Sequence, residues 1–137
     1  MNRVRPAAAA VLAAVALAAC GQGGPAAPPG PGARLYAGNC LACHLTNGEG
    51  IPGVQPPLAG TPVPVGDPRE LLGWVLYGER PPSLPRGQYS GLMPQFSYLS
   101  DADLATLLTY VRSSFGNRAG AITPAMVAEA RAAHRAR

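Results

Sequence analysis

The chain has 137 residues and a mass of 14.0 kDa, which suits one folded domain. It has 11 arginines, no lysine and 7 acidic residues, for a formal charge of +4, and a balance this small without clustered basic residues argues against nucleic-acid binding. The 17 glycines and 16 prolines predict long loops, and three cysteines are too few for a disulfide scaffold. Aromatic residues make up only 6% of the chain, so we expect something other than side chains to fill part of the core.

The N-terminus has the layout of an export signal. Arg3 and Arg5 precede an apolar run at 7–19, which is too short to cross roughly 30 Å of hydrocarbon, so residues 1–19 are predicted to be a signal peptide. Its end, Leu17-Ala18-Ala19-Cys20, resembles the cleavage site of bacterial lipoproteins. That resemblance implies that Cys20 becomes the first mature residue and carries the lipid. The alternative is an ordinary cleavage site in which Cys20 is incidental.

Residues 20–32 are predicted to be a tether. Nine of the twelve residues in 21–32 are Gly or Pro and none is charged, so no helix or strand is expected there. The segment would span about 20 Å as a flexible coil and about 35–40 Å as polyproline. A domain on such a tether could rotate at a membrane surface.

Four helices are predicted after the tether. The second, third and fourth helices each follow a residue that can cap a helix N-terminus: Asp67, Ser100 and Thr123. Asp67 and Ser100 are also followed, three residues later, by an acidic residue. The predicted spans are 33–43, 68–77, 101–115 and 124 to the C-terminus. No alternating strand pattern is present, so the fold class is predicted to be all-α, with a domain at 33–117 and a helical extension at 118–137.

Two long proline-rich loops separate these helices, at 45–66 and 79–99. Loops of this length in a small domain are usually functional or disordered. Apolar residues are scattered through both of them, which predicts that the loops wrap something apolar.

The sequence Cys40-Leu41-Ala42-Cys43-His44 matches the attachment pattern of c-type haem. Two thiols three residues apart on one helical turn can reach the two vinyl groups of one haem, and the adjacent histidine then falls under the iron. The alternatives are a zinc site and a redox dithiol. Zinc prefers four ligands, and His134 is the only other histidine. A thioredoxin-like dithiol needs a βαβ context that this chain lacks.

From this motif outward, residues 33–117 resemble a class I cytochrome c. Tyr36 stands four residues before Cys40, where that family has an aromatic, and Gly32 lies four residues earlier. The segment 107–111 resembles the C-terminal helix of the family, which implies that Leu107 and Tyr110 pack across the first helix. The segment 56–60 resembles the loop whose proline carbonyl, here that of Pro56, accepts a hydrogen bond from Nδ1 of the haem histidine.

The segment 91–96 resembles the loop that supplies the sixth iron ligand, which would be Met93 opposite His44. Met126 is the competing methionine, and it lies on a segment that the minimal family fold lacks. Ligation by His and Met raises the reduction potential and leaves no open position on the iron.

Other residues carry weaker signals. Trp74, Tyr77 and Tyr89 could hydrogen-bond haem propionates, although aromatic residues on an apolar helix face are more often core. Three arginines could pair with propionates or surround the haem edge, although each of them, taken singly, is more readily explained as a solvated side chain: Arg69, Arg80 and Arg86.

The resemblance implies a monohaem electron carrier rather than an enzyme, with one haem c as its cofactor. Export and Cys20 lipidation would place it on the periplasmic side of a bacterial membrane. Its partners would be redox proteins such as a membrane dehydrogenase, oxidase or reductase, and not nucleic acid. Two alternatives are a haem-based gas sensor in which Met93 is labile and an electron-relay subunit of a larger oxidoreductase.

Overall fold

The computed structural model describes residues 29–137, and within this range the fold is helical, as predicted. The signal peptide 1–19, Cys20 and most of the predicted tether lie outside the described residues. The only strand-like pairing in the described range is one isolated antiparallel bridge between Ile51 and Gln55. The six helices are α1 (Pro31–Asn39), α2 (Leu41–His44), α3 (Pro62–Val65), α4 (Pro68–Tyr77), α5 (Asp101–Ser113) and α6 (Pro124–Arg135).

The first predicted helix, 33–43, differs in the structure in two ways. Helix α1 begins at Pro31, inside the predicted tether, because proline has no N–H to satisfy and suits the first turn of a helix. The helix then breaks at Cys40, which adopts φ −122°, and resumes as the short α2. Helix α3 was not predicted, since it has only four residues, two of them prolines, and carries no periodic pattern.

The later helices begin where their caps predict. Ser100 Oγ accepts a hydrogen bond from the N–H of Asp103 at 3.1 Å, and Thr123 caps α6 in the same way. Asp67 caps α4 by accepting from the N–H of Arg69 at 2.8 Å. Glu70, the acid three residues after Asp67, accepts from the Ser83 hydroxyl at 3.3 Å instead of from the backbone N–H of the cap, so the reciprocal bond of a capping box is not formed. Helix α5 ends two residues short of its predicted end, at Ser113.

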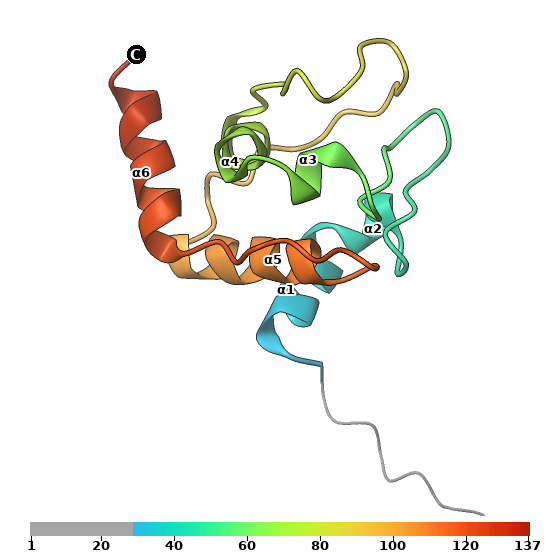
Figure 1. The fold of residues 1–137 in the computed structure, drawn as a ribbon, viewed down its shortest axis with the longest axis horizontal. Coiled ribbons are helices and arrows are strands. Elements are labelled where there is room, and N and C mark those ends of the chain that lie inside the picture. Colours follow the sequence, from blue (N-terminus) through green and yellow to red (C-terminus); the bar gives the residue numbers. More distant parts are fainter. Residues whose placement is uncertain (1–28) are drawn as a thin grey trace, which may run out of the picture.

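Helices α1 and α5 cross and form the base of the molecule (Figure 1). A Cβ on Gly32 would lie 2.6 Å from Cβ of Tyr110, so only glycine allows the two backbones this approach. Beside the crossing, the ring of Tyr36 packs on those of Tyr110 and Phe115 at centroid distances of 5.6 and 5.1 Å. Leu107 is fully buried in the same core.

Helices α3 and α4 lie on the other side of α5 from α1, and α6 stands beside the ends of α4 and α5 (Figure 1). Val127 of α6 is fully buried, and Ile122 just before the helix is nearly so, which means that the C-terminal extension packs on the domain. Among the described residues, no helix combines the length and the hydropathy needed to cross a membrane.

Candidate functional site

A cavity of about 280 Å³ lies between α5, α4, α2 and the two long loops. Its walls are almost wholly apolar, and both loops contribute to them, as predicted from their scattered apolar residues. Leu107 and Val111 of α5 form one wall, and Trp74 of α4 forms part of another. Cys40 and His44 reach this cavity from the segment of α2, and Met93 reaches it from the second long loop.

The two cysteines of the motif lie on one turn of backbone. The N–H of Cys43 donates to the carbonyl of Cys40 at 3.2 Å, and the N–H of Cys40 donates to the carbonyl of Tyr36 at 2.8 Å. Both thiols are partly buried and neither is in a disulfide. Burial, with a smaller contribution from neighbouring Cys43, raises the pKa of the Cys40 thiol to about 11, so this thiol is protonated at neutral pH.

His44 is buried, with 5% of its surface exposed, and its Nδ1 lies 3.0 Å from the carbonyl oxygen of Pro56. Burial lowers the pKa of His44, and the hydrogen bond to Pro56 opposes this shift only in part, so the ring is neutral. A carbonyl oxygen can only accept, so the ring proton is on Nδ1. Nε2 therefore carries the lone pair that a metal ligand needs.

The turn after His44 brings the Pro56 carbonyl to the ring. The N–H of Gly50 donates to the carbonyl of His44 at 3.2 Å, and Gly50 has φ +68°. A Cβ at this position would lie 2.6 Å from the Pro56 oxygen, so glycine is needed both for the backbone angle and for the close approach. Tyr36 also holds this turn, since its hydroxyl donates to the carbonyl of Leu45 at 2.7 Å.

Met93 is partly buried at the cavity and comes from the second long loop. The residues before it are hydrogen-bonded to the first loop: the N–H of Gly91 donates to the carbonyl of Val54 at 2.8 Å, and Nε2 of Gln55 donates to that of Leu92 at 3.2 Å. The loop that supplies the Pro56 carbonyl therefore also holds the segment that carries Met93.

Met126, the competing methionine, packs against the core on α6 and is not part of this cavity.

The weaker aromatic candidates fall into two groups. Trp74 and Tyr89 line the cavity. Tyr77 does not, because its ring stacks on His134 at a centroid distance of 3.6 Å.

None of the three arginines singled out from the sequence lines the cavity. The guanidinium of Arg80 lies 5.4 Å from the ring centroid of Trp74 and donates to the carbonyl of Pro85 at 3.0 Å. Arg69 and Arg86 are both exposed, and Arg69 pairs with Asp67.

Sequence reasoning missed a buried arginine beside the site, Arg112, which does not line the cavity but binds the segment that does. Its Nη1 donates to the carbonyls of Pro64 and Gly66 at 2.6 and 3.1 Å, and its Nε donates to that of Gly120 at 2.6 Å. Burial lowers the pKa of Arg112, with a smaller opposing effect from Asp67. Its position one turn after Leu108, on the apolar face of α5, was the available signal.

Two further polar residues of the loops were missed. Asn117 donates to the carbonyls of Leu58 and Val111 and accepts from the N–H of Gly60 at 2.7 Å, which joins the first loop to the end of α5. Gln55 is 6% exposed. Nothing in the sequence distinguishes either from an ordinary polar loop residue.

These features fit a large apolar group held at Cys40 and approached by His44, with Cys43 on the turn that follows Cys40 although it does not line the cavity. They do not fit zinc, because within residues 29–137 no three His, Cys, Asp or Glu side chains are grouped to hold a metal ion. His134 is instead hydrogen-bonded to Glu79. The fold and the motif together define a haem protein of the c type.

Comparison with known proteins gives the family. The family model for cytochrome c matches residues 30–115, and the chain belongs to this family. It is 36% identical over 100 residues to cytochrome c-552 of Thermus thermophilus, a match that covers 69% of this chain and 67% of the relative. It is 37% identical over 90 residues to the cytochrome c subunit of a quinone-dependent alcohol dehydrogenase of Gluconobacter oxydans. That match covers 64% of this chain.

A similar match is to the gluconate 2-dehydrogenase cytochrome c subunit of Pantoea cypripedii, at 35% identity over 97 residues and 69% of this chain. This chain spans only 19% and 22% of the two dehydrogenase subunits. The family membership makes the protein a class I monohaem cytochrome c with one covalently bound haem c. It is an electron-transfer protein and not itself an enzyme.

Proposed function

We propose that the protein carries single electrons between redox partners at the periplasmic face of a membrane, with His44 and Met93 as the axial ligands of its haem iron. The observation that carries this proposal is the meeting of the two side chains in one apolar cavity. The Pro56 carbonyl beside His44 supports it, because that bond leaves Nε2 of the ring unprotonated.

The haem supplies an iron that accepts and releases one electron at a time. The chain determines the conditions for that exchange. Pro56 fixes the orientation and tautomer of His44. Met93, when ligated, favours the reduced iron and leaves no position for oxygen or another substrate. The apolar cavity walls exclude water, so that little around the iron has to reorganise when its charge changes.

Met93→Ala tests the ligation directly. We expect the oxidised variant to lose the Met–Fe(III) charge-transfer band and the reduced variant to bind carbon monoxide, because one axial position becomes open. The measurement is an absorption spectrum of each redox state, with and without carbon monoxide. The matched control is Met126→Ala, which removes the methionine on α6 and should leave the spectrum unchanged.

An unchanged spectrum of Met93→Ala would contradict Met93 ligation. Carbon monoxide binding by the reduced wild-type protein would instead favour the gas-sensor alternative, in which Met93 leaves the iron readily.

Gly50→Ala tests the link between the turn and the His44 ligand. The new methyl group would displace the Pro56 carbonyl, weaken its bond to Nδ1 and make His44 a less basic ligand, so the reduction potential should rise. Gly53→Ala is the matched control: its φ of +71° imposes similar backbone strain, but a Cβ there has no neighbour within 4 Å.

We expect Gly50→Ala to cost about 1–3 kcal/mol more unfolding free energy than Gly53→Ala. Potentiometry and denaturant unfolding of both haem-loaded variants measure the two effects. Equal potentials and equal stabilities would show that the approach of Gly50 to Pro56 has no influence on the site.

The membrane location in this proposal rests on the N-terminal sequence. A lipid on Cys20 and the Gly/Pro-rich segment after it would hold the domain near the membrane and raise its effective concentration toward partners there. The dehydrogenase subunits among its relatives support partners of that kind, such as a membrane dehydrogenase, oxidase or reductase.

Cys20→Ser tests the anchor, because a hydroxyl cannot accept the thioether-linked lipid. We expect the wild-type protein in the membrane fraction. We expect the variant to lack the lipid and to be no longer cleaved before residue 20. Mass spectrometry of the N-terminal peptide is the measurement. An unmodified Cys20 thiol on the wild-type protein would overturn the anchor and leave the electron-carrier proposal standing.

A further inference from the structure

Residues 78–100, which we call the ligand loop, leave the end of α4 and return to the start of α5, and Met93 lies within them. Near Met93, the loop folds back on α4. The N–H of Phe96 donates to the carbonyl of Val75, and Nε2 of Gln95 donates to that of Tyr77, both at 2.9 Å. Contacts with α4 and with the first long loop therefore hold the middle of the ligand loop, and further contacts are made at its two ends.

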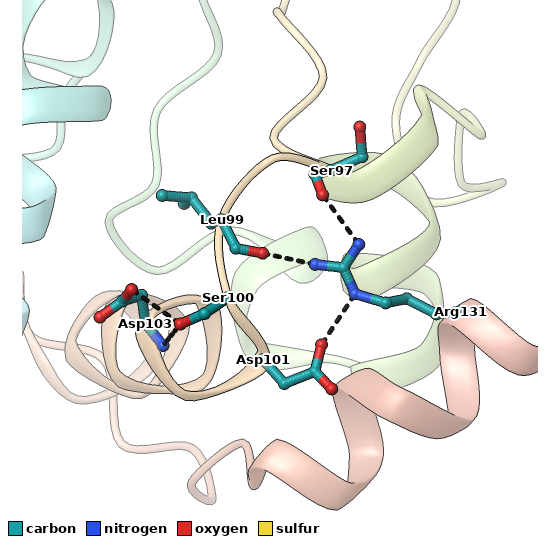
Figure 2. A network of polar contacts seen from close by, with 6 residues as sticks. All are labelled: Ser97, Leu99, Ser100, Asp101, Asp103 and Arg131. Carbon is teal, nitrogen blue, oxygen red and sulfur yellow. Dashed lines mark hydrogen bonds and ion pairs between the residues drawn. The ribbon is translucent and has the colours of Figure 1, made fainter.

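Arg131 of α6 holds the C-terminal end of the ligand loop, where α5 begins (Figure 2). Its Nη1 and Nη2 donate to the carbonyls of Ser97 and Leu99 at 2.8 and 2.6 Å, and its Nε donates to the carboxylate of Asp101 at 2.8 Å. The Arg131 side chain is only 18% exposed, so solvent screens this ion pair less than a surface pair. One guanidinium thus binds two backbone carbonyls and one carboxylate within residues 97–101.

His134, one turn after Arg131, holds the N-terminal end of the ligand loop, where α4 ends. Its ring stacks on Tyr77, the last residue of α4, with an interplanar angle of 8°. Its Nδ1 lies 3.0 Å from the carboxylate of Glu79, and Nη1 of Arg137 donates to the same oxygen at 2.8 Å. Because this end is more exposed than the Arg131 site, we expect it to contribute less.

The cytochrome c family model ends at residue 115, before α6 begins. The contacts at both ends of the ligand loop therefore come from a segment outside the matched domain. We propose that α6 holds both ends of the ligand loop in place. Arg131 and His134 are then positioning residues that set how often Met93 leaves the iron. This inference rests on the proposed ligation by Met93.

The experiment compares Arg131→Ala with the haem-loaded wild-type protein in two ways. Imidazole, added to saturation to the oxidised protein, replaces Met93 at a rate limited by opening of the ligand loop. Hydrogen–deuterium exchange reports the opening of the ligand loop, residues 78–100, whatever the iron ligand is. We expect both to become roughly tenfold faster in Arg131→Ala, because three hydrogen bonds to a charged group are lost.

Two controls separate this role from general stability. Arg135→Ala removes an exposed arginine one turn further along α6 and should match the wild type. Thr123→Ala removes the cap of α6 without touching the ligand loop, and it should lower stability with little change in either rate. Arg131→Lys keeps the charge but cannot reach three acceptors at once, so its rates should fall between those of the wild type and Arg131→Ala.

Unchanged rates of imidazole binding and hydrogen exchange in Arg131→Ala would contradict the proposal that α6 holds the ligand loop. Equal increases of these rates in Thr123→Ala would contradict it as well. A wild-type protein without the Met–Fe(III) charge-transfer band would overturn the ligation by Met93 instead, so the two failures are distinguishable.

Discussion

The structure depends on filling an apolar cavity that the chain encloses but does not occupy. The walls come from α5, α4, α2 and two long loops, and the loops have almost no backbone ladder of their own. An empty cavity of this kind would forfeit packing contacts on every side. A covalently held haem supplies the missing apolar surface, which explains how a chain with 6% aromatic residues sustains a core. The prosthetic group is therefore a structural element as well as the redox centre.

The two sides of the haem site are mechanically connected through the loops. Gly50 allows the Pro56 carbonyl to reach His44, and the neighbouring Gln55 holds the backbone at Leu92, next to Met93. Two adjacent residues of one turn, Gln55 and Pro56, thus contact the Met93 segment and His44. Helix α6 adds an outer support at the two ends of the ligand loop, so the site is held from within the matched domain and from the extension.

The sequence predicted the elements that depend on local rules. Helices α4, α5 and α6 begin after capping residues, and the haem motif depends on spacing alone. The start of α1 at Pro31 was missed because it lies in a Gly/Pro-rich run. The break at Cys40 was missed because no glycine or proline stands directly beside it in the sequence. The burial of Arg112 could be inferred from its place on α5, but the partners of Arg112 and Asn117 could not, since they are backbone carbonyls brought together only by the tertiary fold. Attachment through the cysteines, the axial ligands and lipidation at Cys20 remain predictions.

The most direct test of this account is the folding of the chain without its haem. The variant Cys40→Ala with Cys43→Ala, produced in cells, cannot hold the group covalently. Calorimetry and circular dichroism should show a largely unfolded chain with no cooperative thermal transition, because the cavity walls then lose the surface they pack against. A cooperative transition in the haem-free variant would contradict the claim that the haem is the centre of the core.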